Sequence, residues 1–443
     1  MVNGNETCLM NTFETNSSEL ENIFSGKLTE NGDAAFTGTG NKLIDILFMS
    51  EYYTEHPDEL PMIGDSHTSK VFSMFMRDPR FGMGRREIGR RLMAQTMLTP
   101  QQIVMAGRYD DLYLMPAFTM ENLRYLFDQV KAGNELAKKW MPRYSSKHHG
   151  IAKQFAEMLD VNKQQYGHFI KANTVENTMS RNQWEYIDFS HVPSCAAIKY
   201  VKAFKRHQEE RYAQYIEDVK AGKKELHVST STVYDIYKNR NDIDADVFYG
   251  KIEKINISCI PIIDTSGSML SQDAIGKALS IGKYLSDCSS YCNGQFITFS
   301  ECPQLITQRG DTYNQQIANI LYDGRNWGMN TNFGAVMRIL SNLKTDFPDY
   351  LVVMSDMEFD CASGCDKDRL MAEWAQIGIK TRIIWWNFNG RNKTTPETDK
   401  YGNVFMSGYS PMMLKYMEVG FDAHQFLQKL LGEYAKKVGY TFE

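Results

Sequence analysis

Apolar positions recur at helical spacing through the first half of the chain. Between about residues 41 and 219, apolar residues return every three or four positions, which is the period of a helix with one buried face. The segments with this pattern are 41–49, 69–76, 85–97, 101–105, 121–130, 151–159, 192–207 and 209–219. We therefore predict an all-helical domain over residues 36–224, built from stacked helix pairs with short loops.

The second half follows a different pattern, in which short apolar, β-branched runs alternate with helical segments. The predicted strands are 251–263, 295–300, 304–308, 350–356 and 380–388, and the predicted helices are 272–285, 312–321, 333–343, 368–376 and 422–438. Such alternation is typical of a doubly wound parallel sheet with right-handed crossovers. We predict this α/β domain over residues 251–443, a linker over 225–250 and a flexible acidic arm over 1–35.

The net charge of −5 conceals an asymmetry along the chain. Residues 1–65 carry a net charge of −10, residues 66–224 carry +10, and the remainder carries −5. A basic middle region between acidic flanks indicates a surface that faces a polyanion.

The sequence shows no sign of export or membrane insertion. No apolar run approaches the roughly 20 residues that a spanning helix needs, and the N-terminus lacks the basic start and apolar core of a secretory signal. Eight scattered cysteines fit a reducing compartment. We expect a cytoplasmic, monomeric protein with no membrane partner, and a virion is the alternative location. The pairs Cys288/Cys292 and Cys361/Cys365 allow a zinc site, the alternative being ordinary thiols.

A cluster of oxygen-bearing side chains follows the strand at 251–263. Asp264, Ser266 and Ser268 lie on one short loop, and a carboxylate with two hydroxyls can supply part of the six-oxygen shell of Mg²⁺. Thr331, in a loop before a helix, and Asp356, at the end of the strand 350–356, are placed to supply further ligands. In open α/β sheets, sites lie beyond the carboxyl ends of the strands, so we expect all three segments to converge there.

Together, Asp264, Ser266, Ser268, Thr331 and Asp356 resemble the metal-ion-dependent adhesion site of a von Willebrand factor A domain. The resemblance implies Mg²⁺ or another divalent cation as the cofactor. It also implies a partner protein whose acidic side chain completes the shell of the metal. The alternative is an Asp/Ser turn with no bound ion.

Seven further segments resemble the family called domain of unknown function 2828, found in viruses, plants and other eukaryotes. They are Ala35–Phe48, Phe75–Glu87, Ala106–Leu112, Lys139–Arg143, Val192–Ser194, Ser355–Asp360 and Trp386-Asn387. The architecture of that family is similar to that of the Ro autoantigen (TROVE) proteins, whose helical ring binds small structured RNAs and the ends of misfolded RNAs. The resemblance implies an α+α/β multidomain fold with an N-terminal HEAT-like repeat domain and a C-terminal von Willebrand A-like domain.

Two stretches of the helical region are rich in basic residues. Clusters of this kind bind phosphate backbones through ion pairs, and Tyr109, Trp140 and Tyr144 could stack on unpaired bases. The alternative is a solvated helix face, on which Glu87 and Arg91 pair, with the aromatic residues in the core. The predicted nucleic-acid-binding residues are Arg77, Arg80, Arg85, Arg86, Arg90, Arg91, Lys138, Lys139 and Arg143.

These patterns favour a non-enzymatic ribonucleoprotein scaffold that binds RNA and holds Mg²⁺. One alternative is a protein-interaction module that binds no nucleic acid. Another is a Mg²⁺-dependent phosphohydrolase with Asp264 as the nucleophile. The loop disfavours it, because such enzymes generally carry a second carboxylate two residues after the nucleophile, where this chain has Ser266.

Overall fold

The computed structural model describes residues 27–28, 34–35, 41–171, 174–228, 232–299, 303–323, 347–355, 372–388, 397–398, 402–407 and 411–440. The chain divides into two compact units. The first comprises Met1–Glu14, Tyr53–Tyr215 and Leu427–Glu443, and the second comprises Thr15–Tyr52 and Ile216–Phe426. One is helical and the other is a mixed α/β unit, which confirms the predicted fold class.

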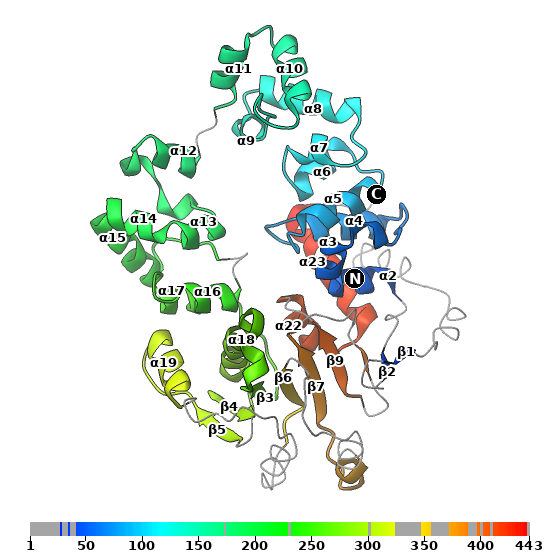
Figure 1. Cartoon of the computed structure of the whole chain (residues 1–443), viewed down its shortest axis with the longest axis vertical. Helices are drawn as coiled ribbons and strands as arrows, with labels where there is room; N and C mark the ends of the chain where they lie inside the picture. The colour runs from blue at the N-terminus through cyan, green and yellow to red at the C-terminus, as the bar shows by residue number, and fades with distance from the viewer. Residues whose placement is uncertain are drawn as a thin grey trace, which may run out of the picture. The chain divides into compact units, whose positions relative to one another are not determined.

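The first unit contains helices and, among its described residues, no strand (Figure 1). The eight predicted helical segments of the chain all correspond to helices, although the segment 192–207 is two helices instead of one and the segment 41–49 lies in the second unit. The helices include η2 (Pro57–Glu59), α4 (His67–Arg77), α5 (Arg86–Ala94), α6 (Pro100–Ala106), α7 (Asp111–Leu114), α8 (Met120–Lys131), α9 (Glu135–Lys139), α10 (His149–Met158), α11 (Lys163–Phe169), α12 (Val175–Ser180), η3 (Trp184–Tyr186), η4 (Phe189–His191), α13 (Ser194–Lys199), α14 (Val201–His207) and α15 (Glu209–Lys220).

Local side chains fix where several of these helices begin. Thr99 accepts a hydrogen bond from the backbone of Gln102, and the Gln102 side chain accepts one from the backbone of Thr99 at the start of α6. Thr119 accepts a bond from Asn122 in the same way at the start of α8. Such caps satisfy backbone donors that the first helical turn leaves unpaired.

The C-terminal helix, α23 (Ala423–Val438), contributes most of its length to the first unit. The Tyr434 ring packs edge-on against Phe75 of α4, with 5.5 Å between the ring centroids. Its hydroxyl donates a hydrogen bond to the buried carboxylate of Asp78, at 3.2 Å. The last helix of the chain is therefore part of the same core as α4.

The second unit contains a seven-stranded sheet of order β5-β4-β3-β6-β7-β9-β8. The edge strands β5 and β8 run antiparallel to their neighbours, and the other pairs are parallel. If β8 is left out and the other six strands are numbered in chain order from β3, their order across the sheet is 3-2-1-4-5-6. This is the strand order of a doubly wound fold. The strands are β3 (Cys259–Asp264), β4 (Gln295–Phe299), β5 (Gln304–Thr307), β6 (Tyr350–Ser355), β7 (Arg382–Asn387), β8 (Glu397–Thr398) and β9 (Val404–Ser407).

The central strands form the core of this unit. Every residue of β3 and of β6 is buried, as expected for parallel strands covered on both faces. Their register pairs Ile262 with Val353. The helices of the unit include α2 (Lys42–Phe48), α16 (Val233–Asn239), α17 (Ala245–Gly250), η5 (Gly267–Asp273), α18 (Ala274–Cys288), α19 (Tyr313–Asp323) and α22 (Pro411–Glu418).

Two segments depart from the division by sequence order. Helix α2 belongs to the α/β unit, where the Phe48 ring packs against Tyr416 and Phe426 at centroid distances of 5.1 and 6.2 Å. The stretch 225–250, interpreted from its polarity as a linker, contains α16 and α17. The predicted arm, 1–35, lies mostly outside the described residues. No helix in the described part of the chain has the length and apolar character needed to cross a bilayer.

Candidate metal site and basic surface

The Asp264 loop lies where the order of the strands reverses. The chain passes from β3 to β4 on one side and later returns to β6 on the other. Asp264 ends β3, and its fully buried carboxylate accepts a hydrogen bond from the Ser355 hydroxyl at the end of β6, at 2.5 Å. The other carboxylate oxygen accepts a bond from the backbone of Ser266, at 2.9 Å. The carboxyl ends of the two strands therefore meet at Asp264, in the crevice where ligands bind in this class of sheet.

The two hydroxyls of the loop that follows this carboxylate lie close to each other. The Oγ atoms of Ser266 and Ser268 are hydrogen-bonded to each other at 3.1 Å. Two adjacent ligands of an octahedral Mg²⁺, each at roughly 2.1 Å, lie about 3.0 Å from one another, so the spacing fits neighbouring positions in one shell. The backbone of Met269 donates to the Ser266 carbonyl at 3.3 Å as η5 begins, which holds the loop in this turn.

The remaining predicted ligands, Thr331 and Asp356, lie outside the described residues. Ser355, which directly precedes Asp356, contacts Asp264. Across the described ranges, no three His, Cys, Asp or Glu side chains gather as metal ligands. The predicted set differs from such a centre because three of its five members are hydroxyls. The metal role of the five residues stays a prediction.

The thiols of Cys288 and Cys292 lie on α18 and just after it. Cys292 is buried, and its sulfur donates to the carbonyl of Cys259 at 3.1 Å. Burial raises the pKa of both Cys288 and Cys292, which favours the protonated thiol over the thiolate that zinc requires. Cys361 and Cys365 lie outside the described residues.

The first basic stretch is partly internal. Arg77 is 1% exposed, and its guanidinium forms an ion pair with Asp111 at 2.7 Å. Arg90 is also buried and donates to the other oxygen of Asp111 at 2.6 Å. A guanidinium held inside the protein by a buried carboxylate cannot reach a phosphate. We therefore remove Arg77 and Arg90 from the predicted nucleic-acid surface.

The other arginines of this stretch lie at or near the surface. Arg80 pairs with Asp78 at 3.3 Å and donates to the Met105 carbonyl. Arg91 lies 3.6 Å from both Glu87 and Asp58. The pair with Glu87 is the one expected if this part of α5 is a solvated helix face. Arg85 is half-buried and Arg86 is exposed at the start of α5.

Arg108, which the sequence reasoning missed, connects the two basic stretches. Its guanidinium carbon lies 4.1 Å from the centre of the Trp140 ring, and the Lys139 ammonium lies 5.3 Å from the same ring. Burial lowers the pKa of Arg108, and the positive charges of Arg86 and Arg77 lower it further. The signal was available in the segment Ala106–Leu112, which carries this arginine beside two aspartates.

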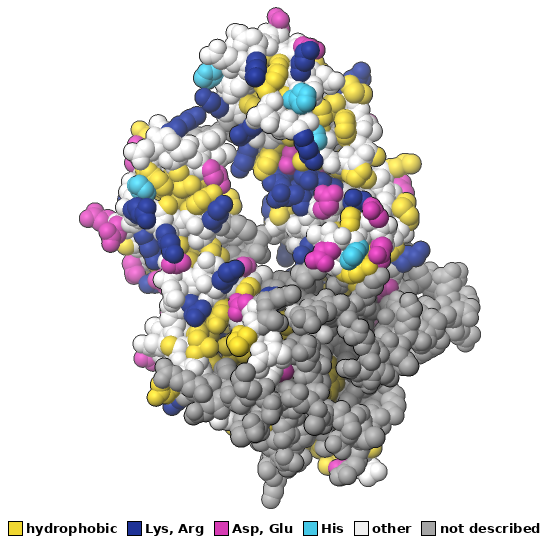
Figure 2. Space-filling view, in the orientation of Figure 1, with side chains coloured by type: hydrophobic (Ala, Val, Ile, Leu, Met, Phe, Trp, Pro, Cys, Tyr) yellow, Lys and Arg dark blue, Asp and Glu magenta, His cyan; other side chains and the backbone are white. Residues whose placement is uncertain are grey.

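Positive charge exceeds negative charge around Asp110 and Asp111. Arg108 and Arg90 lie 3.6 and 3.5 Å from Asp110, and Arg77 and Arg90 share Asp111. Three arginines thus face two carboxylates. Figure 2 shows a dense group of Lys and Arg side chains over α5 to α7. An anion at this surface would be attracted by the unbalanced charge.

The second basic stretch supplies surface residues only. Lys138 pairs with Glu135 at 2.8 Å and lies 5.6 Å from the Phe169 ring centre. Arg143 is exposed. Tyr109 is buried, and Tyr144 packs edge-on against Tyr166. Of the three aromatic residues, Trp140 is the one that contacts both Arg108 and Lys139.

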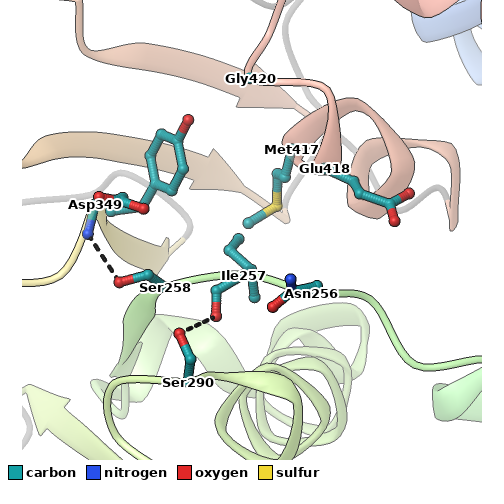
Figure 3. A pocket seen from close by; sticks show the side chains of 9 residues that line it. Asn256, Ile257, Ser258, Ser290, Asp349, Met417, Glu418 and Gly420 are labelled. Atoms are coloured by element: carbon teal, nitrogen blue, oxygen red, sulfur yellow. Dashed lines mark hydrogen bonds between the residues drawn. The ribbon is translucent and has the colours of Figure 1, made fainter.

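A polar pocket of about 340 Å³ lies at the other end of the parallel strands, away from Asp264 (Figure 3). It opens near the amino ends of β3 and β6, where Ser258 accepts a hydrogen bond from the Asp349 backbone at 3.3 Å. Because ligands in doubly wound sheets bind beyond the carboxyl ends, we do not assign this pocket as the functional site. Its lining residues are Asn256, Ile257, Ser258, Ser290, Asp349, Tyr350, Met417, Glu418 and Gly420.

Comparison with known proteins supports the family resemblance. Residues 169–240 match the model of the Domain of unknown function (DUF2828), which confirms the resemblance inferred from the motifs. Residues 258–434 match a second model, the Domain of unknown function (DUF7788). Uncharacterized protein L728 of Acanthamoeba polyphaga mimivirus is 24% identical over 486 residues, covering 87% of this chain and 83% of that protein.

Among solved structures, the Deinococcus radiodurans RO (RSR) protein is similar with a TM-score of 0.41 and 11% identity. The alignment covers 94% of this chain and 96% of that one.

Proposed function

We propose that this chain, with its DUF2828 segment, is a non-enzymatic binding scaffold. Its α/β unit captures an acidic side chain of a partner protein through a divalent cation held by Asp264, Ser266, Ser268, Thr331 and Asp356. The observation that carries the proposal is that the Ser266 and Ser268 hydroxyls lie 3.1 Å apart on the loop that begins at the buried carboxylate of Asp264, at the point where the strand order reverses.

The position of Asp264 favours binding over catalysis. Its side chain is completely buried, and both oxygens are fixed, one by Ser355 and one by the Ser266 backbone. A nucleophilic aspartate must be open to an incoming phosphate, and it works beside an acid or base within hydrogen-bond reach. A fixed carboxylate flanked by hydroxyls instead suits a hard cation with oxygen ligands.

The metal proposal is tested by titrating the full chain with Mn²⁺ and following free Mn²⁺ by electron paramagnetic resonance. We expect one site that Mg²⁺ competes for and that Asp264→Ala or Ser266→Ala abolishes. Ser258→Ala is the matched control, because this serine lies just before β3 at the opposite edge of the sheet. Undiminished Mn²⁺ binding by both site variants, with unchanged circular dichroism, would refute the site.

A carboxylate probe tests the adhesion step separately. If an acidic group completes the shell, acetate added to the Mn²⁺-loaded protein should displace a metal-bound water. The enhancement of water proton relaxation would then fall. Acetate that leaves the relaxation unchanged would argue against an open coordination position.

We propose, as a second activity, that the helical unit binds RNA. The supporting observation is a group of cations at or near the surface around Trp140: Arg108 at 4.1 Å and Lys139 at 5.3 Å from the ring centre, with exposed Arg86 at the start of α5. RNA phosphates would neutralise this charge. Removing one cation that pairs with a phosphate should lower the slope of log affinity against log salt by about 0.7 for a single strand.

The RNA activity is tested with Arg86→Gln and Lys139→Gln, which alter surface cations beside Arg108. We expect weaker RNA binding and a shallower salt dependence. Lys153→Gln is the control, because Lys153 is 71% exposed and lies on α10. If Arg86→Gln and Lys139→Gln bind RNA as tightly as Lys153→Gln and the wild type, the RNA proposal is contradicted. The alternative of a protein-interaction module without nucleic acid would then be favoured.

A further inference from the structure

A stacked pair of aromatic rings lies within the segment that matches DUF2828. Trp184, in η3, and His207, at the end of α14, have ring centroids 4.0 Å apart and planes inclined by only 6°. Among the described residues, the indole is the single ring that contacts His207, and His207 is exposed. The imidazole therefore extends an aromatic stack toward the solvent.

The inner member of the stack is held firmly before any ligand arrives. The Trp184 indole nitrogen donates to the Asn182 side chain at 2.8 Å, and Asn182 adopts a left-handed backbone conformation with φ of 58°. Arg211 donates to the carbonyls of Trp184 and Ile187 at 3.2 and 3.0 Å. A surface fixed in this way loses little entropy when it binds.

A third aromatic side chain, Tyr186, lies two residues after Trp184. Tyr186 is 74% exposed, more than any other tyrosine or tryptophan among the exposed large hydrophobic side chains of the described residues. Tyrosine and tryptophan are common at binding surfaces because they offer a large apolar face with a polar edge. Tyr186 therefore adds an exposed ring to the same short helix, η3, that carries Trp184.

Basic side chains line the neighbouring helices. Lys199, Lys202 and Arg206 are all exposed, and their spacing of three and four residues places them along one face of the nearly continuous helices α13 and α14. Figure 2 shows Lys and Arg side chains over α13 to α15. A row of cations with this spacing can pair with successive phosphates of one strand.

We propose that His207, stacked on Trp184, and Tyr186 form a platform for unpaired bases of single-stranded RNA, whose phosphates follow Lys199, Lys202 and Arg206. This inference rests on the proposed RNA binding and names its ligand class. A duplex cannot use the platform because its bases are already stacked on each other, whereas unpaired bases stack readily on aromatic side chains.

The test uses the full chain and a labelled single-stranded RNA, with its duplex and an abasic strand of equal length for comparison. In Tyr186→Ala/His207→Ala, affinity for the single strand should fall by about five- to 160-fold for each base that loses its stacking partner, because stacking contributes roughly 1–3 kcal/mol per base. The salt dependence should not change, since every cation remains. Affinity for the abasic strand should equal that of the wild type.

Two controls match the substitutions in residue type and exposure. Tyr322→Ala removes a tyrosine that is 62% exposed on α19, and His191→Ala removes an exposed histidine of the same unit. Neither should alter affinity for the single strand. Glu185→Gln, between the two aromatic residues of η3, should raise affinity for the intact and the abasic single strands, because an exposed carboxylate beside the platform repels phosphate.

The outcomes separate the platform from RNA binding in general. If the wild type binds RNA with salt dependence while the double variant binds the intact strand equally well, RNA binding stands and the platform is wrong. If the wild type binds none of the RNAs, both proposals fail. An unchanged affinity of Glu185→Gln would place the RNA elsewhere on the molecule.

Discussion

Asp111 is the residue on which the α4–α7 core depends. It is fully buried, and it accepts hydrogen bonds or ion pairs from Arg77, Arg90 and the backbone of Arg108. Removing one partner of a buried ion pair leaves an uncompensated charge, which is far more costly than losing an exposed pair. The conformation of this region should therefore be unusually sensitive to Asp111.

We predict that Asp111→Ala lowers the free energy of unfolding by about 3–5 kcal/mol, measured by urea denaturation. Glu157→Ala is the matched control. It breaks an i,i+4 pair with Lys153 in which both side chains are more than half exposed, and it should cost less than about 1 kcal/mol. An equal loss of unfolding free energy in the two variants would contradict the predicted contribution of the buried ion pairs.

The sequence could not reveal which arginines point inward. Arg77 and Arg90 occur in a basic run that is typical of a phosphate-binding surface, but their partner, Asp111, lies far away in the chain. The proximity of Ser266 and Ser268 to Asp264 was easier to anticipate, because all three lie on one short loop. The contribution of Thr331 and Asp356 remains a prediction, since it depends on a long-range approach.

Helices α4 and α5 pack closely because Gly89 lies at their contact. A Cβ added to Gly89 would lie 2.5 Å from the Cα atom of Arg77 and 2.6 Å from its Cβ atom. These neighbours include backbone and cannot move aside without separating the helices. Only glycine at position 89 therefore allows α4 and α5 to approach this closely.

Gly89→Ala should destabilise the protein by about 1–3 kcal/mol, the usual cost of overpacking a core. Gly150→Ala, near the start of α10, should have the opposite effect, because a Cβ there meets nothing within 4 Å. Alanine in an open helical position stabilises by about 0.4–1 kcal/mol. The melting temperatures of the two variants should thus move in opposite directions. A shift of the same sign in both would contradict the packing argument.

Elements with a strong apolar period were predictable, and short or polar ones were not. Helices α7 and α9 are four and five residues long, too short for a helical period to emerge from the pattern. The stretch 225–250 reads as polar, yet Ile236 and Phe248 are fully buried in α16 and α17. A few apolar residues in the right positions are enough to dock a helix against its neighbours.

Each unit brings together segments from distant parts of the chain. Phe48 packs on Tyr416 and Phe426 in the α/β unit, and Tyr434 packs on Phe75 in the helical unit. Local periodicity predicted these helices individually but carries no information about which distant helix covers which face. Aromatic side chains make up much of these long-range contacts, and several of their hydroxyls are buried.

The buried phenols predict how the molecule responds to alkali. Burial raises the pKa of Tyr416 to about 12 from an ordinary value of 10.0, and it raises the pKa of Tyr215 to about 12 as well. Below pH 10 both the folded and unfolded chains keep these protons. Between pH 10 and 12 the unfolded chain loses them first, so the free energy of unfolding should fall as pH rises. The lowered pKa of Lys283 acts in the opposite direction only up to its ordinary value of 10.5.

We predict that Tyr416→Phe makes this alkaline loss shallower, by up to about 1.4 kcal/mol per pH unit, because one fewer proton is released on unfolding. The hydroxyl of Tyr416 donates to the Phe421 carbonyl at 2.9 Å, so the variant should also be somewhat less stable below pH 10, where the phenol is protonated in both states. Tyr322→Phe, at a position that is 62% exposed, should leave the slope as it is. Urea denaturation at several pH values, with tyrosinate absorbance followed in parallel, measures both effects. If Tyr416 ionises in the folded protein near pH 10, the phenol is not buried as the structure has it, and the slope of the wild type will match that of Tyr416→Phe.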